Sequence, residues 1–193
     1  MKNNKSIVVS FVLLVLMASL YRILPGRPLG FAPQIAMALF AGSIVKDKKY
    51  AFLLPLFSML VSDILYQVLF QFNLSPVPGF YSGQLINYVL FVLLTVVGFA
   101  IKKTNMVHII AGSLAGATIY FLLSNFTVWI GGGLDITNQP YPKTMTGLLH
   151  CYSEAIPFYQ GSLYATFIFS GILFGGYFIF TQYFMQKPQV AQV

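Results

Sequence analysis

The stretch SMLVSDILYQVLF, from Ser58 to Phe70, carries a single acid, Asp63, within an apolar run of about twenty residues. A run of that length is typical of a helix that crosses a lipid bilayer, where a charged carboxylate is costly. The whole chain contains only four acidic residues. The position of Asp63 therefore raises two questions: whether the chain is a membrane protein, and what this acid does inside it.

The composition of the chain answers the first question. Of its 193 residues, 58% are hydrophobic and 8% are charged, and the mean hydropathy is +0.78. Soluble domains are typically about 25% charged, so this chain would expose too much apolar surface in water. The net charge of +7 comes from small basic groups between apolar runs. That pattern favours orientation in a membrane over binding to nucleic acid.

Hydropathy predicts an all-α integral membrane protein, a compact bundle of about six transmembrane helices in a single domain, 1–193, with a tail at 186–193. The second span is short and has Pro33 near its start, so it is either re-entrant or packed within the bundle. The first span follows two lysines but lacks a clear cleavage site, so we expect a retained helix rather than a signal peptide. The predicted spans cover roughly residues 6–24, 30–45, 50–72, 83–101, 106–130 and 156–184.

The basic residues predict the orientation of these spans. Six spans divide the connections into two sets, and lysine and arginine concentrate on the cytoplasmic side of a membrane. One set holds Lys2, Lys5, Lys46, Lys48, Lys49, Lys102, Lys103 and Lys187, and the other holds Arg22, Arg27 and Lys143. Both termini are therefore expected in the cytoplasm. The longer connections, about 24–30, 73–83 and 131–155, would then face outward.

Given this orientation, the polar residues within the spans gather in the outer half of the bundle. Asp63, Tyr66 and Gln67 share one helical face through their i, i+3, i+4 spacing. Polar groups in spans usually face the bundle interior or an aqueous cavity. The sequence thus predicts an outward-facing pocket, and the candidate substrate-binding residues are Gln34, Asp63, Tyr66, Gln67, Asn87, Asn125, Trp129, Tyr141 and Glu154. The glycine- and proline-containing connection 131–155 is expected to cap it.

Structural roles are open for the same residues. Asp63 can be a structural acid paired with Arg22 or Arg27, or it can be protonated. The aromatic residues near Trp129 can form an interfacial belt, and the asparagines of the spans can simply join neighbouring helices. Faces rich in alanine and glycine in the second, fifth and last spans can pack the bundle or meet a partner protein.

The sequence gives no reason to expect an enzyme. We find no Walker-type glycine loop, no HExxH, no GxSxG and no evident nucleophile–base pair. The single cysteine, Cys151, excludes an intrachain disulfide and a thiolate cluster for zinc. We therefore expect no enzymatic activity, no cofactor and no metal ion.

Several segments carry a family resemblance, among them PGRPLGFAPQIAMALFAG, PLFSMLVSDILYQ and SNFTVWI. Together with the segment from YPKTMTGLLHCYSEAIPFYQ to GGY, they resemble an uncharacterised family of bacterial transport proteins over nearly all of residues 22–178. That family is similar in size, span count and loop pattern to the substrate-binding S components of energy-coupling-factor (ECF) vitamin transporters. The resemblance implies a bacterial cytoplasmic (inner) membrane protein with six helices, a pocket on the outer side and a membrane partner driven by two ATPases.

One feature departs from that family pattern. S components often contact their partner through an Ala-xxx-Ala motif in the first helix, whereas the first span here reads IVVSFVLLVLMASL. Its nearest counterpart is Ala32-xxx-Ala36 in the second span.

The leading hypothesis is a membrane protein that captures a small solute, such as a vitamin or its precursor, for uptake with an ATP-driven partner. One alternative is a proton-coupled secondary transporter that uses Asp63. Another is a non-catalytic membrane scaffold or assembly protein whose polar faces meet partner helices. The sequence shows no inverted repeat of the kind that many secondary transporters contain.

Overall fold

A computed structural model describes residues 2–184, and every regular element within that range is a helix. The elements are α1 (Lys2–Ile23), α2 (Gln34–Ile44), α3 (Lys48–Ala51), α4 (Leu53–Gln71), α5 (Gln84–Gly98), α6 (Met106–Ile130) and α7 (Met145–Phe184). The predicted tail, 186–193, lies outside the described residues. The all-helical class predicted from the sequence is confirmed for the described part of the chain.

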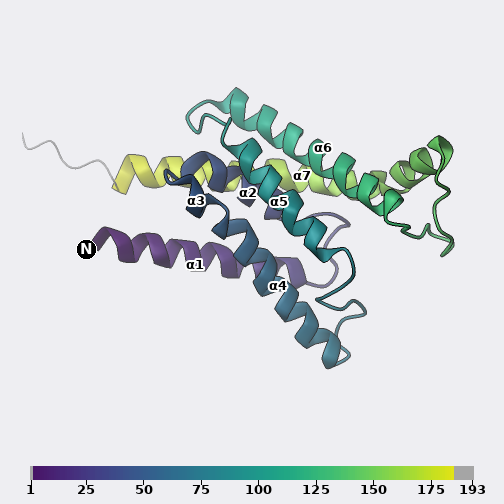
Figure 1. The fold of residues 1–193 in the computed structure, drawn as a ribbon. Coiled ribbons are helices and arrows are strands. Elements are labelled where there is room, and N and C mark those ends of the chain that lie inside the picture. The colour runs from purple at the N-terminus through teal and green to yellow at the C-terminus, as the bar shows by residue number, and fades with distance from the viewer. Residues whose placement is uncertain (1, 185–193) are drawn as a thin grey trace, which may run out of the picture.

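The short helix α2 lies at the centre of the bundle and contacts α4, α5, α6 and α7, while α1 packs mainly on α4 (Figure 1). Every residue from Gln34 to Gly42 is buried. Pro33 precedes the helix, where its missing N–H costs no hydrogen bond. Of the two possibilities for the second span, the structure therefore shows the one in which it is packed within the bundle.

Small residues explain how closely α2 approaches α5. A side-chain carbon placed on Gly42 would meet the carbonyl oxygen of Thr95, and one on Gly98 would meet the backbone of Leu39. Two glycines facing each other thus let the two backbones come into contact. In α6, the corresponding atom on Gly116 would meet the side chain of Leu39. The small faces of α2 and α6 therefore pack the bundle internally.

The last helix carries a different glycine face. Side-chain carbons placed on Gly171, Gly175 and Gly176 would meet nothing within 4 Å. This part of α7 does not use its glycines for internal packing.

Three helical segments of the described residues are long and apolar enough to cross a membrane: Lys48–Gln71, Met106–Ile130 and Met145–Gln182. The segments Val9–Ile23, Gln34–Ile44 and Gln84–Gly98 are apolar but shorter. Many large apolar side chains on the outside of the bundle are exposed, including Met17, Val89 and Ile172. An apolar exterior over apolar helices is typical of a protein whose solvent is lipid.

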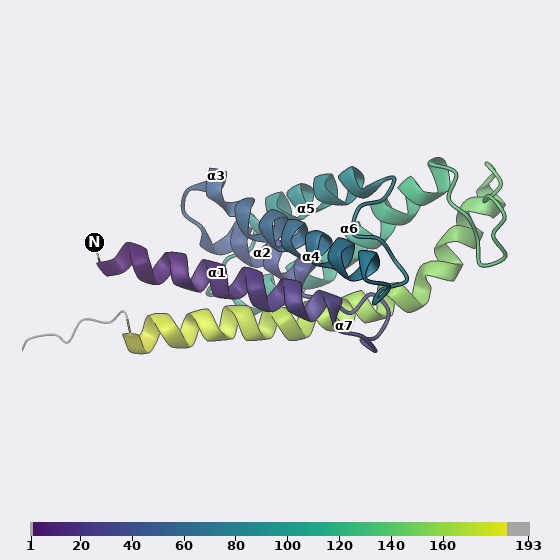
Figure 2. The same ribbon diagram turned by 90° about the horizontal axis from the view of Figure 1, so that it is seen from below.

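The two ends of the bundle differ in character. The start of α1 and the end of α7 lie at one end, together with α3 (Figures 1 and 2). The connection between α6 and α7 lies at the opposite end (Figures 1 and 2). We refer to this second end as the loop end.

Two predicted spans differ from the observed helices. The third predicted span, 50–72, is divided into α3 and α4. The helix that contains the last predicted span, 156–184, is longer than that span, because α7 starts at Met145 and continues through Pro157. Its first turns contain His150, Tyr152 and Glu154, so they are too polar to be recognised as part of a span. The predicted cap 131–155 is accordingly half loop and half helix.

Candidate functional site

A cavity of about 780 Å³ lies at the loop end of the bundle. Its walls come from α1, α2, α4, α5, α6 and α7 and from the connections between them. Its lining mixes charged, amide and hydroxyl groups with aromatic rings, and includes Arg22, Arg27, Gln34, Tyr81, Asn87, Phe91, Tyr120, Ser124, Asn125, Asp135, Tyr141, Cys151, Glu154 and Phe158. Small-molecule sites in proteins are typically cavities of about 300–1,000 Å³ with a few polar groups among apolar ones.

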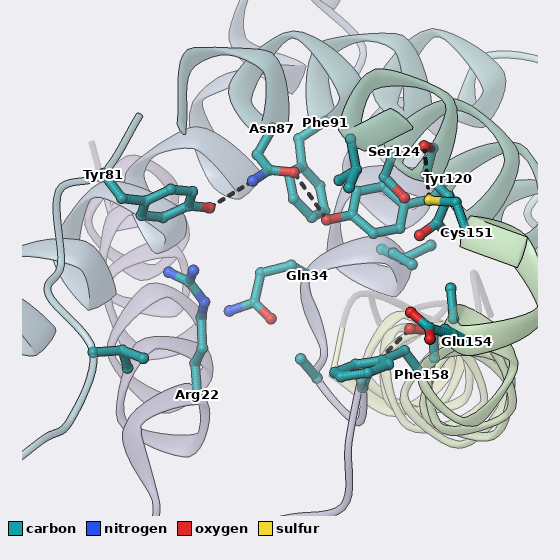
Figure 3. A pocket seen from close by; sticks show the side chains of 18 of the residues that line it. Arg22, Gln34, Tyr81, Asn87, Phe91, Tyr120, Ser124, Cys151, Glu154 and Phe158 are labelled. Carbon is teal, nitrogen blue, oxygen red and sulfur yellow. Dashed lines mark hydrogen bonds between the residues drawn. The ribbon is translucent and has the colours of Figure 1, made fainter. Parts of the chain in front are cut away.

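Gln34, the first residue of α2, carries the most unusual polar group in this lining. Only 3% of the residue is exposed, yet neither its amide nitrogen nor its amide oxygen has a hydrogen-bond partner among the described residues. Figure 3 shows its side chain directed into the space between Arg22 on one side and Glu154 on the other. Buried amide groups are rarely left without partners, because each one costs about 1–3 kcal/mol.

Asn87 on α5 links two tyrosines across one wall. Its amide nitrogen donates to the hydroxyl of Tyr81 at 2.6 Å, and its amide oxygen accepts from the hydroxyl of Tyr120 at 3.1 Å (Figure 3). Tyr120 also packs against Phe91, with ring centroids 5.4 Å apart. The chain of hydrogen bonds fixes the orientation of these rings. We refer to the rings of Tyr81, Phe91 and Tyr120 as the aromatic wall; a flat solute could stack against it.

Glu154 on α7 forms the opposite side of the cavity. Its carboxylate accepts a hydrogen bond of 2.5 Å from the hydroxyl of Tyr141, and it lies 3.0 Å from Nε2 of His150. Burial, and then the hydrogen bond to Glu154, raise the pKa of Tyr141 above its ordinary value. The phenol therefore keeps its proton at neutral pH and acts as a donor to the carboxylate.

The connection between α6 and α7 closes this end of the cavity as a compact hairpin. Leu134 pairs with Pro140, and the carboxylate of Asp135 accepts hydrogen bonds from the backbone N–H groups of Thr137 at 2.8 Å and Gln139 at 2.9 Å. These bonds, with that from the Thr137 hydroxyl foremost, lower the pKa of Asp135.

Trp129 secures the two ends of this connection to each other. Its indole N–H donates to the carbonyl oxygen of Pro142 at 2.8 Å, and Lys143 lies over its ring and donates to its carbonyl oxygen. A single residue near the end of α6 thus holds the far end of the connection, at Pro142 and Lys143.

Asp63 lies behind the wall of the main cavity. It is completely buried, pairs with Arg22, and accepts further hydrogen bonds from the Gln84 amide at 2.5 Å and the Tyr88 hydroxyl at 2.8 Å. Both of its oxygens are therefore engaged by groups from α1 and α5. The sequence left Arg22 and Arg27 as possible partners of Asp63, and in the structure the partner is Arg22.

A smaller cavity of about 380 Å³ adjoins the main one, and Arg22, Arg27, Val77 and Tyr81 line both. Asp63 and Tyr66 line the smaller cavity only. The hydroxyl of Tyr66 donates to the carbonyl oxygen of Arg22 at 2.7 Å. Arg22 and Arg27 therefore separate the buried acid from the main cavity.

The predicted site residues thus divide into three groups. Five line the main cavity: Gln34, Asn87, Asn125, Tyr141 and Glu154. Asp63 and Tyr66 line the smaller one. Gln67 and Trp129 line neither cavity. The Gln67 amide oxygen accepts hydrogen bonds from the N–H groups of Gly79 and Phe80 in the α4–α5 connection, and Trp129 holds the α6–α7 connection.

The residues that sequence reasoning missed include Arg22 and Arg27 as lining groups, and the aromatic residues Tyr81, Phe91 and Tyr120. The aromatic residues gave no signal among 32 phenylalanines, tyrosines and tryptophans (19 + 12 + 1). The arginines did give one. They are the only two in the chain, and both fall within six residues at the loop end, whereas lysine is used elsewhere.

Comparison with known proteins places the chain in a family without assigning it a role. Neither the curated proteins nor the solved structures contain a match to it. Residues 1–190 match DUF6580, described as a family of unknown function, and the chain therefore belongs to that family.

Proposed function

We propose that this protein is a membrane substrate-binding protein that captures a small solute for uptake. The observation that carries the proposal is Gln34: an amide that is almost completely buried, has no partner among the described residues and points into a cavity of about 780 Å³. A solute that hydrogen-bonds this amide would remove the cost of leaving it unpaired. A solute also gives a reason for the fixed aromatic wall beside it.

The direction of uptake follows from the placement of charge. The loop end would face outward, because five lysines lie at the other end of the bundle, where the positive-inside rule expects the cytoplasm. Lys48 and Lys49 lie in α3, Lys46 lies just before it, and Lys102 and Lys103 lie in the α5–α6 connection. In this orientation the cavity would receive the solute from outside the bacterial cytoplasmic membrane. Both termini would be cytoplasmic.

The resemblance to ECF S components supports two further parts of the proposal. The solute would be a vitamin or a vitamin precursor, and transport would depend on a membrane partner driven by ATPases. The chain itself contains no nucleotide-binding glycine loop that could supply that energy.

Proton-coupled transport through Asp63 is a weaker reading of the same site. The two oxygens of Asp63 already accept from Arg22, Gln84 and Tyr88. This saturated environment fits a group that positions Arg22 better than one that exchanges protons with a transported solute.

The proposal is tested by blocking the cavity. Ser124 lines it, whereas Ser153 is exposed on α7 and does not, so Ser124→Phe and Ser153→Phe make the same change inside and outside the cavity. The wild-type protein and both variants are purified from the native membrane, and released small molecules are identified by mass spectrometry. We expect one compound to accompany the wild-type protein and Ser153→Phe but not Ser124→Phe.

Two outcomes would overturn the proposal. One is a compound retained equally by Ser124→Phe. The other is the absence of any compound from all three proteins combined with growth on limiting vitamins that is unaffected by Ser124→Phe. Either result would favour a scaffold or assembly role.

A further inference from the structure

The charged groups of the main cavity are separated by sign. Arg22 and Arg27 come from the end of α1 and the connection that follows it. Asp135 and Glu154 come from the α6–α7 connection and the start of α7. In Figure 3, Arg22 and Glu154 lie on opposite sides of the space, with the amide of Gln34 between them. A solute that fills this space would therefore meet cationic groups at one end and anionic groups at the other.

The first arginine is held firmly in place. Nη1 of Arg22 donates to the Asp63 carboxylate and to the Ser62 hydroxyl, both on α4. Asp63 is in turn fixed by Gln84 and Tyr88 on α5. Among the described residues, the guanidinium uses only this one nitrogen for hydrogen bonds. The remaining donors of a rigid, planar group are thus available to a ligand.

The second arginine has no acidic partner in the described part of the chain. The close contacts between acidic and basic groups found there join Arg22 to Asp63 and His150 to Glu154, and the second is an ion pair only when the histidine is protonated. Arg27 instead donates to three neutral acceptors: the carbonyl oxygen of Arg22 at 2.8 Å, that of Phe31 at 3.3 Å and the Tyr66 hydroxyl at 3.4 Å. Its positive charge lies half-buried beside the cavity and is not neutralised.

An uncompensated guanidinium in a partly dry site attracts an anion more strongly than one in water, because the local dielectric constant is lower. Arginine also matches carboxylate and phosphate groups geometrically through parallel N–H donors. At the other end, Glu154 can accept hydrogen bonds, and its carboxylate would repel an anionic group. The arrangement therefore determines which end of the solute faces the arginines, as well as the sign of the charge that binds there.

We propose that the solute is an organic anion whose carboxylate or phosphate group binds at Arg22 and Arg27 and whose opposite end carries hydrogen-bond donors that face Glu154. This inference rests on the proposed function, because it concerns the same cavity. It adds the chemical class and the orientation of the solute. The part of the solute between these two ends would pair with the Gln34 amide and stack against the aromatic wall.

The test uses three ring compounds of similar shape as probes: benzoate, phenyl phosphate and the neutral benzamide. Binding to the purified full-length protein is measured by thermal unfolding in lipid nanodiscs over a range of probe concentrations. We expect benzoate or phenyl phosphate to bind at least about tenfold more tightly than benzamide, as one charge-assisted hydrogen bond provides. Comparison of the two anions shows whether the site prefers a carboxylate or a phosphate.

Matched variants locate the effect. Arg27→Gln is expected to abolish the preference for the anions, whereas Lys102→Gln, which removes the same charge from an exposed position at the other end, should leave it unchanged. Arg27→Lys keeps the charge and loses the planar donor group, so it should retain part of the preference. This second variant keeps the test decisive if Arg27→Gln does not fold.

Two results would overturn the inference: equal binding of benzoate, phenyl phosphate and benzamide by the wild-type protein, or an anion preference that survives in Arg27→Gln. Equal, measurable binding of all three would leave a solute cavity and remove only its anionic character. The proposed function itself is tested separately, by whether a compound accompanies the wild-type protein but not Ser124→Phe.

Discussion

Asp63 sits where three helices meet, and its partners explain how an acid is accommodated in an apolar helix. Arg22 comes from α1, while Gln84 and Tyr88 come from α5. A buried carboxylate is tolerated when it is paired and when its other lone pairs accept hydrogen bonds, and Asp63 meets both conditions. The acid therefore ties α4 to α1 and α5, and it fixes the guanidinium that lines the cavity.

This arrangement predicts a stability effect for Asp63→Asn. The variant leaves the charge of Arg22 without its partner and turns an amide N–H₂ group toward donors, so unfolding should become easier by about 1–3 kcal/mol. For a chain of this size, that corresponds to a fall in the unfolding temperature of roughly 3–10 °C. Asp47→Asn makes the same change at an exposed helix cap, where asparagine serves equally well, and should leave the temperature unchanged. Equal behaviour of the two variants would contradict a structural role for Asp63.

For Gln34 we expect the opposite combination of effects on replacement: unchanged or higher stability, and weaker binding of the solute. Gln34→Met keeps the approximate volume and removes a buried amide that has no partner among the described residues, so the empty protein should be as stable as the wild type or more stable. Binding of the solute should weaken about five- to a hundredfold, because one hydrogen-bonding group is lost. Thermal unfolding without solute and uptake with solute measure the two effects. A destabilised variant that transports normally would contradict a binding role.

The sequence predicted individual polar residues better than it predicted their partners. Gln34, Asn87 and Asn125 are predicted because they are polar within apolar spans, and Glu154 because it lies at the outer entrance of the last span. All four line one cavity. The same criterion also selected Gln67, whose amide holds the α4–α5 connection instead. A polar residue in a span must find a partner, but only the fold decides whether that partner is the protein's own backbone or a solute.

At the level of elements, prediction succeeded where hydropathy and capping agree. The fifth span is predicted at 106–130, and α6 runs over Met106–Ile130. The Asn105 side chain caps its start, and Gly132, with a left-handed backbone, ends it. The start of α7 was missed because its first turns are polar. Those turns lie beside the α6–α7 connection at the loop end, where polar side chains such as Glu154 face the cavity.

The α6–α7 connection predicts a pH-dependent change. The folded state lowers the pKa of Asp135, chiefly through the hydrogen bond from Thr137. Its contribution to the hairpin is therefore complete above the unfolded value of about 3.9 and is lost as the pH falls through the lower, folded value. Trp129, the only tryptophan, anchors this connection, so its fluorescence should change on acidification below about pH 4.

Asp135→Asn is the matched control for this prediction. The asparagine cannot titrate, so the acid-induced change in Trp129 fluorescence should disappear or become much smaller. A transition of unchanged size and midpoint in Asp135→Asn would assign it to another group, such as Glu154, which lies in the same wall of the cavity.

For the molecule as a whole, the proposed orientation rests on the distribution of basic residues, and it decides which side of the membrane the cavity would face. The start of α1, α3 and the end of α7 lie at one end of the bundle, and the α6–α7 connection lies at the other (Figures 1 and 2). Residues of that connection line the cavity. Among the residues that the structure describes, three helical segments are long and apolar enough to cross a bilayer, while the central α2 is short and surrounded by other helices. Hydropathy identified the apolar segments, but it does not distinguish a helix buried among helices from one that faces lipid.

Cysteine labelling tests this orientation in intact cells. Cys151 is replaced by serine, and single cysteines are introduced at Lys46 and Met106, at the basic end, and at Leu74, in the α4–α5 connection; all three positions are exposed. A membrane-impermeant maleimide should label Leu74→Cys in intact cells, and it should label Lys46→Cys and Met106→Cys only after the membrane is opened. Labelling of Lys46→Cys in intact cells with Leu74→Cys protected would place the cavity on the cytoplasmic side. Capture of a solute from outside would then be excluded, because Gln34, Arg27 and Glu154 would all face the cytoplasm.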